Sequence, residues 1–272
     1  MKYRLCKTTL EAIRSHFTIA EIDGLFEDLR IDGVEGWKCS HPDASLSLFR
    51  WTTTNLKCAR KALNEVVAQM APNNQKFTWL SDPQSKHLGF DDLLDDYGFE
   101  LSHQVEVMAK NLSRTTVVRQ SDNAAWHWEV PDQKSVARII SNAFKISEEV
   151  AAIFHRSYLE PSKFQATTIY GVSAPENDEV VAVGYLSYLT QTPAVLLRVA
   201  ATLPQYRRLG LYRKLVRKRL EAATDEGYCT AYVHSYSADS ANLLAMEGFK
   251  TVANLRLSIG PHKRLTKLVS YR

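Results

Sequence analysis

The chain has 272 residues, of which 45% are hydrophobic and 24% are charged, a composition typical of a folded globular protein and not of a disordered one. It contains no run of about 18 apolar residues and no signal-like apolar stretch after Met1, which excludes an ordinary membrane-spanning helix and predicts a cytoplasmic protein. The net charge of +4 is uneven, because residues 1–113 carry 13 basic and 16 acidic side chains (−3) and residues 114–272 carry 21 and 14 (+7), so the second half suits an anionic ligand, either nucleic acid or a phosphorylated cofactor.

The four cysteines, Cys6, Cys39, Cys58 and Cys229, are scattered and include no Cys-x-x-Cys pair. This spacing favours reduced thiols over a disulfide framework. Cys39 and His41 are close in sequence, but two ligands do not make a zinc site, which needs three or four. The sequence therefore predicts no metal site.

Two segments that lie 150 positions apart share one pattern: residues 93–99 read LLDDYGF and residues 243–249 read LLAMEGF. In both, a helix-like stretch ends at a glycine and the following phenylalanine starts an alternating strand. The repeat predicts two similar domains, residues 1–113 and residues 114–272. The linker is expected in one of two polar stretches, residues 113–116 or 120–123.

In the second half, strands and helices alternate. Asp132, Ser147 and either Ser237 or Asp239 stand where a helix N-cap is expected. The resulting order, β-α-α-β-β-β-α-β-α-β, predicts an α/β sandwich in which helices flank a mostly antiparallel sheet. The expected strands cover residues 126–130, 164–172, 180–189, 194–201 and 231–236, with a last strand after Phe249, and the expected helices cover residues 132–144, 147–159, 210–226 and the stretch before Gly248.

One strand-to-helix turn in the second half has the features of a phosphate site. Pro204 ends the strand at residues 194–201, because proline has no N–H to donate to a sheet. Gly210 opens the next helix, where free backbone N–H groups and the helix dipole favour an anion, and its missing Cβ lets a phosphate come close. Arg207 and Arg208 add charge-assisted hydrogen bonds. The turn is therefore predicted to hold a pyrophosphate.

The segment Arg207-Arg208-Leu209-Gly210-Leu211-Tyr212 resembles the R/Q-x-x-G-x-G/A pyrophosphate loop of the GNAT superfamily of acyl-CoA N-acyltransferases. Pro204 before the loop, the basic amphipathic helix after it and Gly248-Phe249 near the end agree with that resemblance. Within this superfamily, three segments resemble the glycine N-acyltransferase branch: residues 202–207 (TLPQYR), Gly210-Leu211 and Tyr236-Ser237. The first half is similar to the degenerate copy, without a CoA motif, that tandem members carry, so the resemblance implies two GNAT-like domains in tandem.

The resemblance implies an N-acetyltransferase that transfers an acyl group from acetyl-CoA to the amine of a small molecule or an amino acid by direct attack, without a metal. In this family the pantetheine lies beside the strand that precedes the loop, like an additional strand, and the loop amides face the pyrophosphate. The CoA-binding residues that follow by position are Ala200, Ala201 and Thr202 for the pantetheine, Arg207, Arg208, Leu209, Gly210, Leu211, Tyr212 and Arg213 for the pyrophosphate, and Ser237.

The sequence departs from the family pattern at three points. Tyr212 replaces the last Gly/Ala of the loop, Leu244 replaces the tyrosine that often serves as general acid, and the strand at residues 194–201 has no carboxylate to act as base. His234 and Tyr236 are the candidate catalytic residues, because both exchange protons and both lie on or just after the strand that should border the thioester. A histidine hydrogen-bonded within the sheet and a serine that only caps a helix are the structural alternatives for His234 and for the neighbouring Ser237.

Two further alternatives stay open. Without the usual acid, the chain could be a CoA-binding sensor or interaction protein with little turnover. Nucleic acid is not expected, because no aromatic platform or groove-reading motif accompanies the basic residues, which are interpreted as a solvated helix side with two arginines used on CoA. The sequence leaves open a monomer or a homodimer. The basic residues in question are Arg207, Arg208, Arg213, Lys214, Arg217, Lys218 and Arg219.

Overall fold

The computed structural model describes seven stretches of the chain, and both polar stretches that were expected to hold the linker lie outside them. The described residues are 6–16, 26–40, 47–70, 76–112, 126–159, 165–189 and 192–261.

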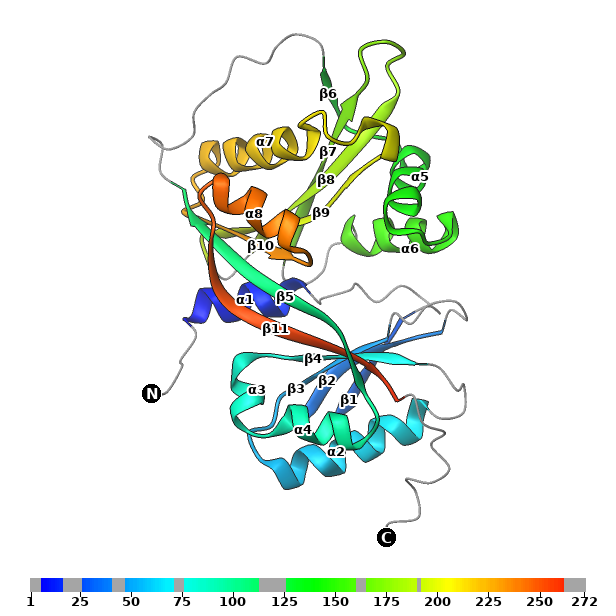
Figure 1. The fold of residues 1–272 in the computed structure, drawn as a ribbon, viewed down its shortest axis with the longest axis vertical. Coiled ribbons are helices and arrows are strands. Elements are labelled where there is room, and N and C mark those ends of the chain that lie inside the picture. The colour runs from blue at the N-terminus through cyan, green and yellow to red at the C-terminus, as the bar shows by residue number, and fades with distance from the viewer. Residues whose placement is uncertain are drawn as a thin grey trace.

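A single sheet of eleven strands runs through the described residues, in the order β1-β2-β3-β4-β11-β5-β10-β9-β8-β7-β6 (Figure 1). Two of its strand pairs, β3 with β4 and β9 with β10, are parallel, and the others are antiparallel. Helices cover the sheet, so the predicted α/β sandwich with a mostly antiparallel sheet is confirmed. The elements of the first half are α1 (Lys7–His16), β1 (Phe26–Ile31), β2 (Val34–Cys39), β3 (Leu48–Trp51), α2 (Leu56–Met70), β4 (Phe77–Ser81), α3 (Pro83–His87), α4 (Phe90–Asp96) and β5 (Glu100–Asn111).

The second half has the predicted element order, and its helices begin at the predicted caps. The side chain of Asp132 accepts from the Ser135 amide, Ser147 from the Val150 amide at 3.2 Å, and Ser237 from the Ser240 amide. The elements of this half are β6 (His127–Glu129), α5 (Gln133–Phe144), α6 (Glu148–Leu159), β7 (Gln165–Ser173), β8 (Val180–Leu189), β9 (Ala194–Thr202), the short 3₁₀ helix η2 (Pro204–Tyr206), α7 (Leu211–Asp225), β10 (Thr230–Ser235), α8 (Ala238–Met246) and β11 (Lys250–Gly260).

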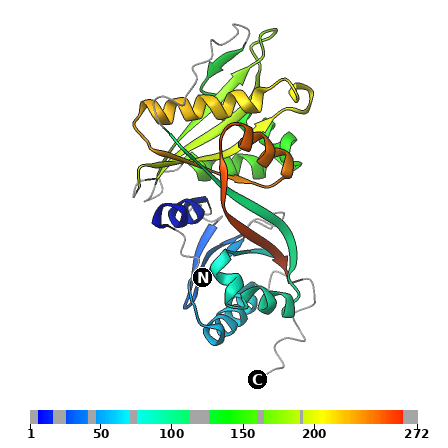
Figure 2. The same ribbon diagram turned by 60° about the vertical axis from the view of Figure 1, so that its left-hand side comes forward.

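The two halves share their last strands. Strand β5 lies between β11 and β10, and β11 lies between β4 and β5, so each half of the sequence contributes a strand to the sheet of the other. Figures 1 and 2 show both long strands running from one half of the molecule into the other. The sequence division at residue 113 stays a prediction, and the pairing shows that both halves depend on one continuous sheet.

The segments that repeat in the sequence form the same turn. The amide of Phe99 donates to the carbonyl of Leu94, and the amide of Phe249 donates to that of Leu244, both at 3.0 Å. Between helix and strand the glycine in each copy has a positive φ, 77° in the first and 89° in the second, a conformation that glycine adopts without steric cost. The repeated letters therefore encode a helix end followed by a strand.

The sheet of the second half has a different cover on each face. Tyr185 of β8 points to α6, where its hydroxyl lies 2.8 Å from Nδ1 of His155. The next residue toward the N-terminus, Gly184, faces Arg219 of α7. On the α6 side, helix α1 packs against β10 through Thr9 and Tyr232, whose oxygens lie 3.3 Å apart. The faces therefore differ: α1 and α6 lie on one side of these strands and α7 on the other (Figure 2).

Candidate functional site

Strands β9 and β10 part in the middle of the sheet. Their parallel pairing runs from Ala194 opposite Thr230 to Leu197 opposite Val233 and then ends. Beyond that point β10 continues beside β5, while β9 continues to Thr202 beside β8. Within the described part of the chain, the pairing of β9 with β10 does not extend to residues 199–202. The Thr202 carbonyl accepts from Nε of Arg207 at 3.4 Å, and the other backbone groups on this edge can pair with a ligand.

A β-bulge lies where β9 separates. Ala200 is opposite Gly184 and Arg198 is opposite Tyr185, so Val199 has no counterpart in β8. A bulge bends its strand and redirects the peptide groups beside it. Strand β9 is buried up to the bulge and becomes half-buried at Val199 and Ala200. The pantetheine residues predicted from the sequence, Ala200, Ala201 and Thr202, follow directly.

The loop from β9 to α7 leaves a helix N-terminus without a side-chain cap. Gly210 is the N-cap, with φ of 78°, and no side-chain hydrogen bond caps the helix there. The first intrahelical bond runs from the Lys214 amide to the Gly210 carbonyl at 3.1 Å, so the amides of residues 211–213 precede it. Arg208 adopts a φ of 65°, which is uncommon for a residue with a Cβ and is often found at ligand sites. This turn has the features of an anion site.

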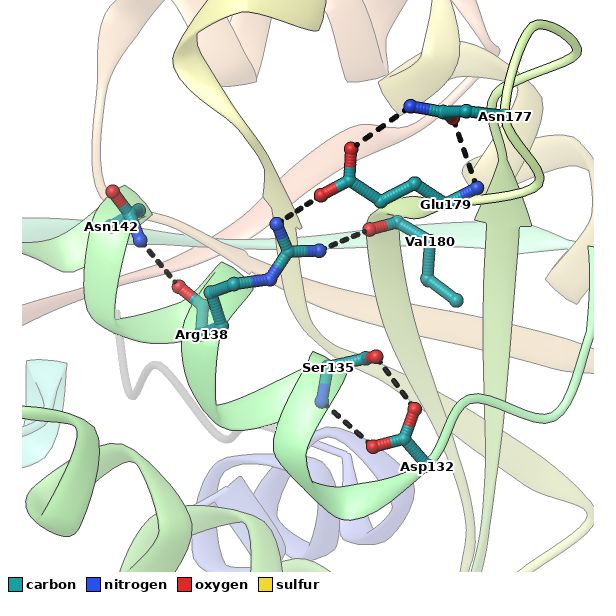
Figure 3. A network of polar contacts seen from close by, with 7 residues as sticks. All are labelled: Asp132, Ser135, Arg138, Asn142, Asn177, Glu179 and Val180. Atoms are coloured by element: carbon teal, nitrogen blue, oxygen red, sulfur yellow. Dashed lines mark hydrogen bonds and ion pairs between the residues drawn. The ribbon is translucent and has the colours of Figure 1, made fainter.

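Neighbouring elements fix the start of this loop. The amide of Leu203 donates to the carbonyl of Val181 in β8 at 2.9 Å. Figure 3 shows the network beside it: Arg138 of α5 forms an ion pair with Glu179 and donates to the carbonyl of Val180 at 2.9 Å. The Glu179 amide in turn donates to Asn177 at 3.0 Å. Helix α5 thereby holds the end of β8 against which the loop begins.

Three residues that were predicted to bind CoA have side chains that already contact other parts of the protein. The Tyr212 hydroxyl lies 3.2 Å from Oγ of Ser240 in α8, so its ring is directed to α8. The side chain of Arg213 forms an ion pair with Glu247, which leaves its amide for a phosphate. Ser237 is the N-cap of α8, with its Oγ 3.2 Å from the Ser240 amide. The structural reading of Ser237 is thus confirmed, and its contact with CoA stays a prediction.

The interpretation of the α7 basic residues as a solvated face is wrong for Arg219. Its side chain is buried, with 1% of the residue exposed. Nε donates to the Leu215 carbonyl at 2.9 Å, and Nη1 donates to the carbonyls of Tyr185 and Arg198, both at 3.0 Å. Loss of solvent lowers the pKa of Arg219 to about 10, which still leaves it charged at neutral pH. The packing of α7 on the sheet turns this position inward, and three carbonyls replace the water.

His234 and Tyr236 meet a buried arginine on the α6 side of the parted strands. Arg198 is 3% exposed, and its guanidinium carbon lies 4.5 Å from the centre of the Tyr158 ring. Burial and the charge of Arg198 lower the pKa of His234 to about 3. Burial of the hydroxyl and the neighbouring Tyr158 raise the pKa of Tyr236, although 44% of the residue is exposed. At neutral pH the site therefore holds a neutral imidazole and a protonated phenol.

Sequence reasoning assigned no role to several residues that lie in this cluster, among them Arg198 and Tyr158. One signal was available, because Arg198 is the single charged residue in the apolar stretch 194–201. The first half also reaches the cluster: the ring centre of His103 in β5 lies 6.0 Å from that of Tyr236. That contact depends on the exchange of strands, which the sequence pattern does not reveal.

The second half of the chain matches a known protein family in sequence. Residues 135–249 match the sequence profile described as the acetyltransferase (GNAT) family. This segment is a GNAT domain. It begins in α5 and ends at Phe249, so it contains the bulge, the loop and both candidate catalytic residues. No curated protein sequence matches the chain.

Solved structures with the GNAT fold are similar over nearly the whole chain. A GCN5-related N-acetyltransferase from Kribbella flavida has a TM-score of 0.71 at 12% identity, covering 97% of this chain and 99% of that one. A GCN5-related N-acetyltransferase from Sphaerobacter thermophilus has a TM-score of 0.60 at 10% identity, covering 84% and 76%. A tandem GNAT protein from the clavulanic acid biosynthesis pathway has a TM-score of 0.60 at 11% identity, covering 93% and 94%. The chain therefore has the GNAT fold, in an arrangement similar to that of a tandem member, while the glycine N-acyltransferase branch stays a prediction.

Two structural features are absent from the part of the chain that the structure describes. None of its helices combines the length and the apolar content needed to cross a membrane. Among the same residues, no three or more His, Cys, Asp or Glu side chains form a group that could hold a metal ion.

Proposed function

We propose that this protein is an N-acyltransferase that transfers an acetyl group from acetyl-CoA to the amine of a small molecule or an amino acid. The observation that carries the proposal is the combination of two features in the GNAT domain, the parting of β9 from β10 after Leu197 and the α7 N-terminus at Gly210 without a side-chain cap. Together they offer a strand edge and an anion site, connected by one loop. The cytoplasmic location predicted from the composition belongs to the same proposal.

The chain's own residues fit the two ends of a CoA molecule. The amides of residues 211–213 and the charge of Arg208 suit the pyrophosphate, and the edge of β9 at residues 200–202, which β10 does not cover, suits the amide groups of the pantetheine arm. When bound, acetyl-CoA supplies an acyl group activated as a thioester. In the overall transfer the C–N bond of the amide forms, the C–S bond breaks, the amine loses one proton and the CoA sulfur gains one.

The protonation states of the cluster assign the proton roles. Tyr236 keeps its proton at neutral pH because its pKa is raised, and a protonated phenol is the form that can donate to the departing sulfur. His234, with a pKa of about 3, is a weak proton acceptor. We therefore assign proton donation to Tyr236, a positioning contact to His234, and removal of the amine proton to water.

A sensor without turnover is the second candidate function. Leu244 occupies the position at which the family usually carries its acid. Its side chain is fully buried and, being aliphatic, cannot donate a proton. The test is thiol release from acetyl-CoA in the presence of a panel of amines and amino acids. Turnover with at least one acceptor supports the transferase, whereas CoA binding without thiol release for every acceptor supports the sensor.

A further inference from the structure

Arg219 joins three elements at the bulge of β9. Its Nη1 donates to one carbonyl of β8, that of Tyr185, and to one carbonyl of β9, that of Arg198. Its Nε donates to Leu215 of its own helix, which fixes the side chain to α7. The two strand residues are opposite each other in register, immediately beside the extra residue Val199. A single buried guanidinium therefore holds the strands at the point where β9 leaves β10.

The guanidinium of Arg219 also packs against the backbone of Gly184. A Cβ on Gly184 would lie 3.1 Å from Cζ and 3.2 Å from Nε of Arg219. Such distances are shorter than ordinary van der Waals contact, so a Cβ at residue 184 requires the guanidinium to shift by a few tenths of an ångström. Gly184 is opposite Ala200, the residue just past the bulge. The sequence thus provides both the cation and the space that it occupies.

The bond from Arg219 sets the direction of one peptide group. A peptide group is planar and trans, so its C=O and its N–H point in opposite directions. Because the Arg198 carbonyl points to Arg219 on the α7 side, the N–H of Val199 points to the other face. That face carries the Arg198 side chain, Tyr158 and the candidate acid Tyr236. A cation bonded to the carbonyl also polarises the same peptide group and strengthens its N–H as a donor.

We propose that Arg219 is a positioning residue that directs and strengthens the Val199 N–H as the donor to the carbonyl oxygen of the acyl thioester. The proposal rests on the proposed function, since it requires a thioester at the parted strands. In this proposal Arg219 contacts neither acetyl-CoA nor the amine substrate and acts through the Arg198–Val199 peptide. Burying the charge of Arg219 is costly, since a neutral side chain of similar size would pack without loss of hydration. Its bonds to three carbonyls offset that cost.

The decisive readout is the infrared stretch of the thioester carbonyl in acetyl-CoA labelled with ¹³C at that carbon. In the wild-type protein the bound carbonyl band should lie at lower frequency than in solution, because a polarised donor weakens the C=O bond. In Arg219→Met the shift should decrease, and kcat should fall about tenfold to a hundredfold. This is less than the about 10²–10³-fold expected for loss of a donor to the oxyanion, because the Val199 N–H itself remains. The affinity for free CoA, which has no acyl carbonyl, should stay within about twofold.

Two controls separate positioning from loss of stability. Arg217→Met makes the same chemical change on the same helix, but Arg217 pairs with Glu247, so kcat and the carbonyl band should stay as in the wild type. Val216→Ala removes buried volume from α7 while keeping the side chain of Arg219 and should lower stability with the band unchanged. If Arg219→Met does not fold, Gly184→Ala tests the same contact, because it keeps the charge and shifts the guanidinium, and the band shift and kcat should change in the same direction by a smaller amount.

An unshifted kcat and an unshifted band in a folded Arg219→Met or Gly184→Ala protein would overturn the proposal. So would an equal loss of the band shift in Val216→Ala. These outcomes differ from failure of the proposed function. In that case the wild-type protein itself would release no thiol with any amine, whatever the variants do.

Discussion

The two halves contain equivalent strand-to-helix turns that end differently. In the first half β3 leads to α2, in the second β9 leads to α7, and each strand pairs in parallel with the strand that follows its helix. Both helices have 15 residues. At the start of α2 the side chain of Asn55 accepts from the amides of Lys57 at 2.9 Å and Cys58 at 3.3 Å. At the start of α7 Gly210 provides no side-chain acceptor.

This difference decides which turn can hold a phosphate. Free amides at a helix N-terminus bind anions, and a side-chain cap satisfies the same groups internally. The strand also differs, because β3 has four residues and β9 has nine with a bulge. At the ninth residue of the helix, α2 has Asn64, bonded to the Tyr97 hydroxyl at 2.7 Å, and α7 has the buried Arg219. We therefore propose that one architecture serves as a scaffold with a capped turn in the first half and as the phosphate site in the second.

The largest effect is expected for Gly210→Val. A branched Cβ at a φ of 78° is strained by about 1–2 kcal/mol and occupies the approach to the first amides of α7. CoA affinity should fall at least about a hundredfold, since each lost charge-assisted hydrogen bond is worth about 1.5–3 kcal/mol. Titration calorimetry with CoA measures this directly.

Gly89→Val is the matched control for that variant. Gly89 is the N-cap of α4 in the first half, with a φ of 73° and open space around it. The two variants share the backbone strain and differ in the site. Unchanged CoA affinity in Gly210→Val, or an equal loss in Gly89→Val, would show that the α7 turn is not the phosphate site.

The next largest effect concerns the acid. Tyr236→Phe should lower turnover at least about tenfold, the low end for loss of acid–base help, with CoA affinity nearly constant. Tyr232→Phe serves as control, because its hydroxyl contacts Thr9 of α1. Steady-state kinetics that give equal kcat for the wild type and Tyr236→Phe would remove Tyr236 from the mechanism and leave proton donation to solvent.

Sequence reasoning predicted what depends on local chemistry. The caps Asp132 and Ser237 and the Gly–Phe turns are encoded within a few residues, and the glycine of the α7 turn was recognised for the same reason. It failed for Arg219 and could not assign Arg198, because both are charged residues whose burial depends on the packing of α7 and α6 on the sheet. The exchange of β5 and β11 was also not predictable, since an alternating strand does not specify its neighbour.

A smaller effect, on the stability of the fold, is expected at low pH. The pKa of His234 is about 3 in the folded protein and about 6.5 in an unfolded chain. Above pH 6.5 both states hold a neutral imidazole, and as the pH falls toward 3 only the unfolded state gains the proton. Stability should therefore be lost over that range. His234→Asn should lose less stability between pH 6.5 and 4 than the wild type in denaturant titrations, and parallel curves would contradict the burial of a neutral His234.

The smallest effect is expected at the turn before α2, where Asn55 caps the helix. Asn55→Ala removes the side-chain cap of α2 and should lower the free energy of unfolding by about 1 kcal/mol. CoA affinity should not change, because the amides of α2 take no part in binding. Urea unfolding and calorimetry on one preparation measure both quantities, and weaker CoA binding in this variant would place the first half in the ligand site.

The comparison of the two turns is tested most directly by the backbone amide resonances of a ¹⁵N-labelled protein during titration with CoA. The amides of residues 208–213 should shift most and in proportion to occupancy, while those of Lys57 and Cys58 should keep their positions. Large shifts at Lys57 and Cys58 with unmoved resonances at 208–213 would contradict the assignment of the CoA site to the second half.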